Sequence, residues 1–220
     1  MEKTPKNIQH IFNKISQYYD FMNNIISLCT HKFIKTKCAE MLDIPQRARV
    51  LDLCCGTGDT AWIIKRLYKR SNVIGVDFSD KMLDIARKKC KYVEFYNLDI
   101  SKLPFEKCSF DTITCTFGLR NVENIETVLE NISKILRHGG EFMQLDFAYK
   151  NFFSKIFDFY LLTMAKLLKK NLVAYKYLVD SKKEFPKPEE LIKICEKYSL
   201  KLKTKRDFFF GIISMQIYTK

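Results

Sequence analysis

The stretch from Val50 to Thr60, VLDLCCGTGDT, constrains the fold of this chain more than any other part of the sequence. It begins in a short apolar and β-branched run, ARVLDL, which predicts a buried strand, and the TAWIIKRLY that follows has helical spacing. Glycines at positions 56 and 58 permit a tight turn between the two and let a ligand lie against the backbone. The free N–H groups at the start of the helix suit a carboxylate or phosphate. The stretch therefore predicts a strand, a binding turn and a helix.

The middle of the chain repeats this alternation. The runs NVIGVD, YVEFYNLD, FDTITCTF and EFMQLDF are strand-like. Helical segments lie between them at about residues 80–89 and 124–136, and the second is expected to end at Gly139 and Gly140. Strands that alternate with helices at this spacing form right-handed βαβ units. We therefore expect an α/β, doubly wound, mostly parallel sheet.

Other kinds of segment flank the alternation. The first residues have apolar side chains three and four apart, and the segment after Lys150 is helical and strongly apolar. Two strand-like runs close the chain, and their tight join makes them antiparallel. The expected helices lie at about 31–42, 152–169, 172–179 and 188–198, and the hairpin strands at 200–208 and 211–218.

The segments together predict one domain over residues 1–220 with a seven-stranded sheet. Its expected parts are N-terminal helices (1–46), a cofactor-binding core (47–148), a helical insertion or lid (149–198) and the terminal hairpin (199–220). The chain has eight cysteines, none of them in a C-x-x-C pair. A structural zinc site needs paired ligands at short spacing, so we expect no metal.

The positive charge of the chain is compatible with several classes of binding partner and does not distinguish between them. The net charge is +13, and residues 150–206 hold 15 Lys or Arg against 6 Asp or Glu. A lysine-rich solvated face is the simplest explanation, and nucleic acid or an anionic membrane surface are the functional ones. The N-terminus lacks the apolar core of a secretory signal, and the apolar stretch 156–168 falls short of the about 20 residues that span a bilayer. We expect a cytoplasmic protein.

Acidic side chains follow three successive predicted strands, at the edge where open α/β sheets bind ligands. Asp77, about 20 residues after the glycines, can accept hydrogen bonds from a ribose diol. Asp99 can accept from an adenine amino group. The loop also matches the loose G-x-G-x-x-A pattern of nicotinamide dinucleotide sites. However, Asp52 and Asp59 would repel a pyrophosphate, whereas Asp52 could meet an ammonium group. The acidic rim therefore favours S-adenosylmethionine.

Several motifs resemble those of one family, the C-methyltransferases of ubiquinone and menaquinone biosynthesis. The motifs are Tyr19-Asp20-Phe21-Met22-Asn23 with Ser27 and His31, Leu103-Pro104-Phe105, Ser109-Phe110-Asp111, Thr116-Phe117-Gly118-Leu119-Arg120-Asn121 and Leu136-Arg137-His138-Gly139-Gly140. The chain departs from the family pattern at Ile34, usually tryptophan, at Thr116, usually serine, and at Asp146, usually glutamate. In this family small residues occupy the first turn, so Cys54 and Cys55 are interpreted as packing residues and not as a redox pair.

The resemblance implies a class I, Rossmann-like methyltransferase that uses S-adenosylmethionine to methylate a polyprenyl hydroquinone ring. It implies cofactor contacts at Thr57, Asp77, Asp99, Ile100 and Thr116. Of these, Asp77 and Asp99 are also indicated by their positions at the strand ends. The complete candidate cofactor set is Asp52, Gly56, Thr57, Gly58, Asp77, Phe78, Asp99, Ile100 and Thr116.

Chemistry at a ring carbon needs a group that takes the proton of the neighbouring hydroxyl and a charge that stabilises the phenolate. His31, Arg120, Asn121 and Asp20 are the candidates. Arg120 stays protonated and is interpreted as the electrostatic stabiliser. His31 is interpreted as the base or as the group that orients it.

The apolar helices after residue 150 could cover a polyprenyl tail, and their basic excess favours peripheral contact with the inner face of an anionic membrane. Ordinary core packing explains the same pattern. A nucleic-acid methyltransferase is disfavoured because the turn after the fourth strand lacks proline, so no nucleic-acid partner is expected. A nicotinamide oxidoreductase and a non-enzymatic scaffold are two rival functions for the same fold. The sequence leaves open a benzoquinol or a naphthoquinol acceptor, and a homodimer.

Overall fold

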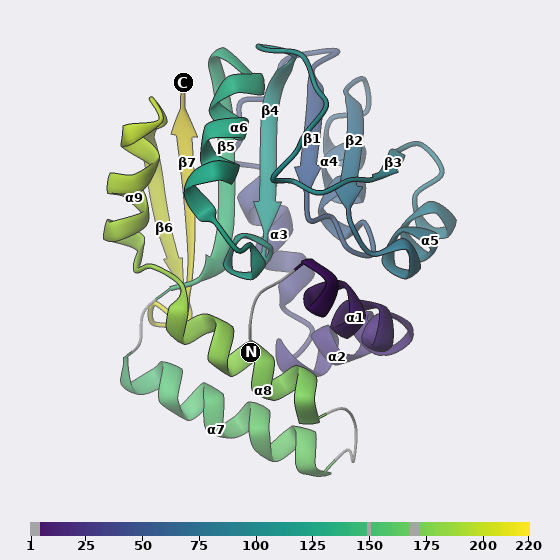
Figure 1. Ribbon diagram of the computed structural model, residues 1–220, viewed down its shortest axis with the longest axis vertical. Helices are drawn as coiled ribbons and strands as arrows, with labels where there is room; N and C mark the ends of the chain where they lie inside the picture. Colours follow the sequence, from purple (N-terminus) through teal and green to yellow (C-terminus); the bar gives the residue numbers. More distant parts are fainter. Residues whose placement is uncertain (1–4, 149–150, 168–171) are drawn as a thin grey trace.

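The computed structural model describes residues 5–148, 151–167 and 172–220. In this part of the chain one sheet has the strand order β3-β2-β1-β4-β5-β7-β6 (Figure 1). Strands β1 to β5 pair in parallel, and β7 lies antiparallel between β5 and β6. The expected mostly parallel sheet with an antiparallel terminal hairpin is confirmed. The strands are β1 (Arg49–Leu53), β2 (Asn72–Asp77), β3 (Glu94–Asn97), β4 (Phe110–Thr116), β5 (Leu136–Phe147), β6 (Lys201–Phe208) and β7 (Ile213–Thr219).

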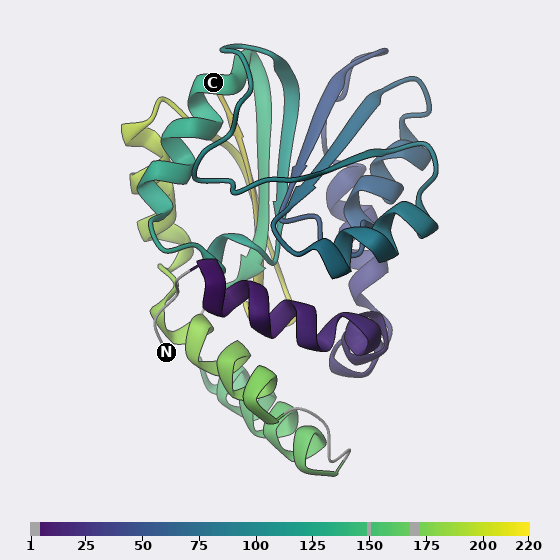
Figure 2. The same ribbon diagram turned by 45° about the vertical axis from the view of Figure 1, so that its right-hand side comes forward.

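Helices cover both faces of the sheet. The helices α3, α4 and α5 lie on one face, and α6 and α9 lie on the other (Figure 2). This is the arrangement that right-handed crossovers produce. The helices are α1 (Pro5–Ile15), η1 (Ser16–Tyr18), α2 (Tyr19–Ile26), α3 (His31–Ala39), α4 (Asp59–Leu67), α5 (Asp80–Lys89), η2 (Leu119–Asn121), α6 (Ile125–Ile135), α7 (Phe152–Leu167), α8 (Leu172–Glu184) and α9 (Pro188–Lys197).

The central strand β1 is buried on both sides, which explains its near-continuous apolar run. Leu51 and Leu53 belong to the cluster that packs under α6 and α9, and Val50 belongs to the cluster under α4 and α5. Burying one such side chain contributes about 1.5–3 kcal/mol. The strand is therefore fixed at the middle of the sheet, and its carboxyl end delivers the glycine loop to the binding edge.

Some element boundaries differ from the sequence expectation. The prediction that Gly139 and Gly140 end a helix is wrong, because α6 ends at Ile135 and Leu136 already belongs to β5. Leu136 pairs with Phe110 across a bulge, so the chain is extended before it reaches the glycines. Helix α8 runs beyond its expected end, to residue 184. The helix expected to reach residue 169 is described as far as 167, and its last two residues lie outside the described residues.

The N-terminal helices and the α7–α8 hairpin gather at the carboxyl ends of the parallel strands (Figure 1). The Gln9 side-chain amide of α1 donates to the Phe78 carbonyl at 2.6 Å, and the Tyr160 hydroxyl of α7 donates to the Ile25 carbonyl at 3.0 Å. These contacts tie the covering helices to the edge of the sheet and to one another. Among the described helices, none is long and apolar enough to cross a membrane.

Candidate active site

The loop after β1 is held in a conformation that ordinary side chains rarely adopt. Gly56 and Gly58 have φ angles of 55° and 81°, and Cys54, between the strand and the glycines, has a φ of 52°. A Cβ atom at Gly58 would lie 3.1 Å from both Ala86 and Phe95, so glycine there also permits close packing of the loop on α5 and β3. The Gly56 N–H donates to Asp77 at 2.9 Å, which fastens the loop to the end of β2.

Two cavities of similar size open at this edge. The first, about 490 Å³, holds carboxylates from the ends of β2 and β3 and is called the acidic cavity. It is lined in part by Asp77, Phe78, Asp99, Ile100, Ser101, Met82, Ile8, Phe12 and Asn121. The second, about 480 Å³, is called the aromatic cavity. It is lined in part by Phe117, Phe147, Phe153, Phe157, Tyr160, Phe209, Phe210, Ser27, His31 and Arg120.

The two cavities meet at the ends of β1 and β4. Tyr19, Cys54, Gly56, Thr116 and Phe117 line both of them. Cys54 and Phe117 have positive φ angles of 52° and 56°. Such strain in non-glycine residues costs on the order of 1–3 kcal/mol each and concentrates at functional sites. Because both cavities share these residues, groups bound in the two cavities can meet at this junction.

The acidic cavity has the chemistry that an adenosine needs. Asp77 accepts the N–H groups of Gly56 and Ser79, each at 2.9 Å, and burial raises the pKa of its carboxyl although these bonds oppose the change. A carboxylate has about four acceptor positions, so Asp77 keeps capacity for a diol. Asp99 accepts from the Ser101 N–H at 2.9 Å and lies across the same cavity. These residues, with Phe78, Ile100, Gly56 and Thr116, are brought together as expected.

Three expected cofactor residues are placed elsewhere. The Asp52 carboxyl is fully buried below the loop, where it accepts from the Thr114 hydroxyl at 2.7 Å and from the Ala61 N–H at 3.1 Å. Burial raises the pKa of Asp52 to about 7. Neither Asp52 nor Gly58 is among the described residues that line a cavity, and Thr57 lines the aromatic cavity only. Asp52 therefore supports the loop from within instead of meeting an ammonium group at its surface.

Arg120 reaches the aromatic cavity from η2 and is fixed by an ion pair. Its Nη1 donates to the Asp146 carboxylate at 2.9 Å and to the Phe117 carbonyl at 2.5 Å. Asp146 is almost fully buried, and this burial raises its pKa while the guanidinium partly offsets the rise. The guanidinium carbon lies 5.3 Å from the centre of the Phe147 ring. Arg120 Nε is buried and has no hydrogen-bond partner among the described residues. A fixed positive charge thus faces an apolar cavity.

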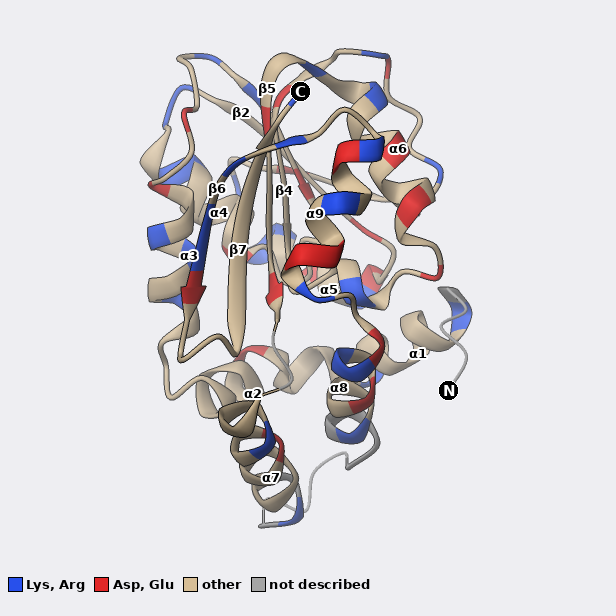
Figure 3. Cartoon of the chain, turned by 90° about the vertical axis from the view of Figure 1, so that its left-hand side faces the viewer, with Lys and Arg blue, Asp and Glu red and all other residues tan. Residues whose placement is uncertain are grey.

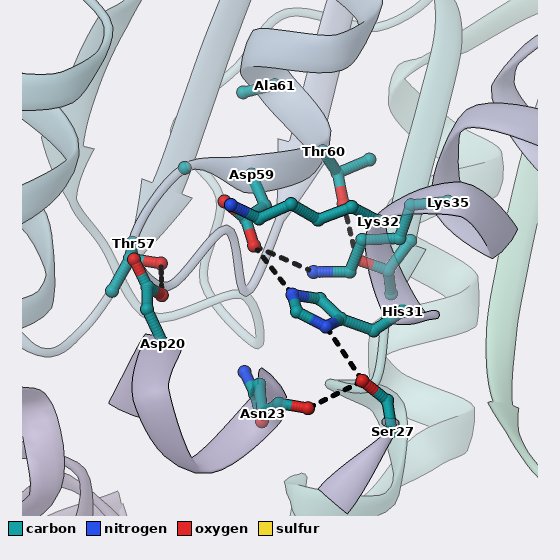
Figure 4. Close-up of polar contacts among 12 residues, drawn as sticks. Asp20, Asn23, Ser27, His31, Lys32, Lys35, Thr57, Asp59, Thr60 and Ala61 are labelled. Atoms are coloured by element: carbon teal, nitrogen blue, oxygen red, sulfur yellow. Dashed lines mark hydrogen bonds and ion pairs between the residues drawn. The ribbon is translucent and has the colours of Figure 1, made fainter. Parts of the chain in front are cut away.

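His31 lies in the wall of the same cavity, within a cluster of polar side chains (Figure 4). Its Nδ1 is 2.9 Å from the Ser27 hydroxyl oxygen, and its Nε2 is 3.5 Å from the Asp59 carboxylate. Lys35 Nζ is 3.7 Å from Asp59, and Lys89 also pairs with it. In the sequence, Ser27 is one member of a motif and Asp59 is only an obstacle to pyrophosphate. Their spacing along the chain gives no signal that both flank one imidazole.

The other two catalytic candidates lie outside the described lining of the aromatic cavity. Asp20 accepts from the Thr57 hydroxyl at 2.6 Å and pairs with Lys89 at 3.1 Å. Asn121 lines the acidic cavity, where its side-chain oxygen accepts from the Tyr177 hydroxyl at 2.9 Å. The structure therefore brings Arg120 and His31 to the aromatic cavity. Asp20 instead contacts Thr57 and Lys89, and Asn121 lines the acidic cavity.

The cysteine pair of the loop is reduced, as are the other six cysteines. Contact with Cys115 together with burial raises the pKa of the Cys54 thiol, and burial raises that of Cys55. Both are therefore protonated small side chains in the walls of the cavities. In the described part of the chain, no group of His, Cys, Asp and Glu side chains is placed to hold a metal ion.

Some known proteins resemble this chain in sequence, and some solved structures resemble it in fold. The model of the ubiE/COQ5 methyltransferase family matches residues 1–220. A demethylmenaquinone methyltransferase of Bacillus licheniformis is 31% identical over 227 residues, which cover 99% of this chain and 98% of that protein. A methyltransferase structure from Thermotoga maritima superposes with a TM-score of 0.72 at 21% identity and covers 97% of this chain and 99% of that one.

A phosphoethanolamine N-methyltransferase from Haemonchus contortus, solved with S-adenosylmethionine, superposes with a TM-score of 0.65 at 15% identity. It matches 84% of this chain and 52% of its own length, and at this identity it shows the fold alone. The family match over the whole chain and the loop-and-strand-end geometry agree. The chain belongs to the ubiE/COQ5 methyltransferase family and is an enzyme with the class I, S-adenosylmethionine-dependent methyltransferase fold.

Proposed function

We propose that this enzyme transfers a methyl group from S-adenosylmethionine to a ring carbon of a polyprenyl hydroquinone, with demethylmenaquinol as the acceptor. The observation that carries the proposal is the pair of cavities, one acidic and one aromatic, that meet at the ends of β1 and β4. Full-length similarity to demethylmenaquinone methyltransferases supports a naphthoquinol over a benzoquinol.

The acidic cavity is the place for the methyl donor. Asp77 would accept from its ribose and Asp99 from its adenine, and the Gly56 backbone would lie against the amino-acid part. When bound, the donor supplies a methyl group on a positively charged sulfur. The residues of this chain supply alignment, which is worth up to about 7–11 kcal/mol for two well-placed reactants.

The aromatic cavity is the place for the quinol ring and the first part of its tail. A ring carbon attacks well only when the adjacent hydroxyl has lost its proton, because the phenolate pushes charge onto the ring. The Arg120 guanidinium faces this cavity from a buried position, where a charge stabilises an oxyanion more strongly than it does in water. Arg120 remains protonated, so its role is to stabilise the phenolate and not to remove the proton.

Turnover with a methyl-deuterated donor tests the proposal. The purified enzyme would be incubated with short-chain demethylmenaquinol, with a 2-polyprenyl benzoquinol and with total RNA, each under reducing conditions. We expect a trideuterated methyl group on a ring carbon of the naphthoquinol, assigned by mass and carbon NMR. Label on a quinol oxygen, or label in RNA alone, would contradict the proposal.

We also propose that the enzyme meets its acceptor at an anionic membrane surface. Leu28, Ile156 and Phe210 line the mouth of the aromatic cavity and are 75%, 51% and 77% exposed. The Phe210 ring stacks on Phe153 with centroids 4.6 Å apart, which continues the apolar rim. Uncharged residues make up most of α7 (Figure 3), and Lys155 on this helix is exposed. A lipid-borne substrate could enter the cavity directly from a bilayer held at this rim.

Sedimentation with vesicles measures this contact. Vesicles of phosphatidylcholine with added phosphatidylserine should bind the protein at low salt, and Ile156→Ser with Phe210→Ser should weaken the binding at least tenfold. Tyr92→Ser is the matched control, because Tyr92 is an 84% exposed aromatic residue that lines neither cavity in the described structure. Absence of binding by the wild type at low salt, or equal losses in rim and control variants, would refute the contact.

A further inference from the structure

Both imidazole nitrogens of His31 have a side chain of the protein beside them. Nε2 is buried, has no hydrogen-bond partner among the described residues, and lies 3.5 Å from the Asp59 carboxylate. Nδ1 is 2.9 Å from the Ser27 hydroxyl oxygen (Figure 4). A quinol in the cavity therefore cannot give its proton to His31 directly without breaking one of these contacts.

The surroundings of His31 determine which nitrogen carries the hydrogen. Burial by itself raises the pKa of the Asp59 carboxyl, but His31, Lys35 and Lys89 together outweigh burial and hold that pKa well below its usual range. An ionised carboxylate can only accept, so the nitrogen that faces it, Nε2, carries the hydrogen. In neutral His31 this leaves the lone pair on Nδ1, directed at Ser27.

Ser27 lines the aromatic cavity beside His31. It is half-buried, and its hydroxyl donates to the Asn23 carbonyl at 2.6 Å. A hydroxyl has one hydrogen, so this hydrogen must turn from Asn23 to His31 Nδ1 before it can be relayed. Leu28 and Cys29, which join α2 to α3, both have left-handed φ angles, 49° and 64°. Two consecutive non-glycine residues in this region are costly, and here they turn the chain so that the end of α2 meets the start of α3.

We propose that Ser27 is a catalytic residue that takes the proton of the quinol hydroxyl and relays it to His31, and that Asp59 is the positioning residue that keeps Nδ1 free to receive it. This relay rests on the proposed function and adds a residue, Ser27, to its machinery. The constellation is a hydroxyl, an imidazole and a carboxylate in series, as in other sites where a carboxylate orients an imidazole base.

The relay conserves protons and charge. The quinol O–H bond breaks as a new O–H bond forms at Ser27, and the original Ser27 proton turns from the Asn23 carbonyl and passes to His31 Nδ1. The electron pair stays on the quinol oxygen as a phenolate, and His31 becomes an imidazolium beside Asp59. After the ring carbon bonds the methyl group, its own hydrogen leaves as a proton to water, and His31 returns its proton to the ring oxygen through Ser27.

The charged groups around this relay come from several elements. Asp59 on α4, Lys35 on α3 and Lys89 on α5 face one another directly beside His31. Asp20 of α2 contacts Lys89. Arg120 of η2 and Tyr19 of α2 line the same cavity. The wild type and the serine variants below share all these groups, so kinetic comparisons among them at one pH cancel their contribution.

Kinetics of Ser27→Ala against Ser71→Ala test the proposal. Ser71 is a buried serine at the opposite edge of the sheet, and its hydroxyl donates to the carbonyl three residues back, much as that of Ser27 donates to the carbonyl four residues back. We expect Ser27→Ala to lower kcat about 100-fold at pH 7, the lower end of the effect of general acid–base groups, with donor affinity unchanged. Ser27→Thr, which keeps the hydroxyl, should recover most of the loss, and Ser71→Ala should behave as wild type.

A pH series distinguishes proton transfer from packing. As the pH approaches about 10, where phenol-type hydroxyls ionise by themselves, the kcat ratio of wild type to Ser27→Ala should fall to within threefold. A ratio that stays constant from pH 7 to 10, or a loss below threefold at pH 7, would overturn the relay.

Nitrogen NMR of the wild-type imidazole tests the relay without turnover, even where a variant folds poorly. We expect the hydrogen of neutral His31 on Nε2, and a mixture of both tautomers in Asp59→Asn. A wild-type hydrogen on Nδ1 would overturn the relay. Failure of every quinol to be methylated would instead refute the proposed function, while the tautomer result would still stand.

Discussion

The buried pair of Arg120 and Asp146 permits a prediction in which stability and catalysis separate. Arg120→Met removes two hydrogen bonds of Nη1, those to Asp146 and to the Phe117 carbonyl, and leaves a carboxyl that is 1% exposed without its counter-ion. Removal of one partner of a buried pair costs about 3–5 kcal/mol. For a chain of this size each kcal/mol lowers Tm by roughly 2–4 °C, so we expect a fall of about 6–20 °C.

The double variant Arg120→Met with Asp146→Leu leaves no unpaired charge. It should regain most of the lost stability, to within about 2 kcal/mol of wild type, because hydrophobic replacements of a buried pair are often neutral. It should nevertheless lack methyl transfer, since the charge that faces the aromatic cavity is gone. Urea unfolding gives the free energies, and the labelled-donor assay gives the turnover.

The same pair predicts a pH dependence. Burial raises the pKa of Asp146, and without the guanidinium that pKa rises further. An acid whose pKa is higher in the folded than in the unfolded state loses stability as the pH rises. Arg120→Met should therefore be less destabilised at pH 5 than at pH 8. Equal destabilisation at both pH values, or a double variant as unstable as Arg120→Met, would refute this account of the pair.

Three other substitutions have definite outcomes. Asp52→Asn removes a buried acid whose pKa is raised to about 7. Ionisation of this acid destabilises the wild type as the pH rises from about 4 to 7. The free energy of unfolding of the variant, relative to that of the wild type, should therefore increase by about 4 kcal/mol across that range. A pH-independent difference in urea titrations would contradict this. Asp77→Ala should weaken donor binding at least tenfold by calorimetry, through loss of charge-assisted bonds of about 1.5–3 kcal/mol, whereas unchanged affinity would remove the donor from the acidic cavity. Gly118→Ala places a Cβ 2.4 Å from the Cys54 Cβ; it should cost about 1–3 kcal/mol of stability, and Cys54→Gly should partly restore it. A Gly118→Ala variant as stable as the wild type would contradict the close approach of Gly118 to Cys54.

The mostly parallel pairing of the sheet could be predicted because it follows from local patterns in the sequence. Apolar runs that alternate with helical spacing leave a parallel sheet as the simple solution, and carboxylates such as Asp77 and Asp99 then fall at one edge regardless of details. Family membership removes the nicotinamide site that the loop pattern by itself left open. The depth of Asp52 could not be predicted, because a carboxylate at the end of a strand can point outward or under the loop.

The partners of the catalytic candidates depend on contacts that no local pattern contains. The acid nearest to Arg120 in the sequence is Glu123, yet the partner of Arg120 is Asp146, which lies near the end of the adjacent strand β5. The contact between His31 and Asp59 joins two helices, α3 and α4, that precede and follow β1 along the chain. Only the assembled edge of the sheet decides such pairings, since each side chain alone has several acceptable environments.

A crystal structure with S-adenosylhomocysteine and a short-chain naphthoquinol tests the central claim most directly. The adenosine should lie beside Asp77 and Asp99, the quinol ring should lie in the aromatic cavity with a hydroxyl near Ser27, and the sulfur should point through the junction at Gly56 and Thr116. An adenosine in the aromatic cavity, or a quinol ring bound outside it, would contradict the division of labour between the two cavities.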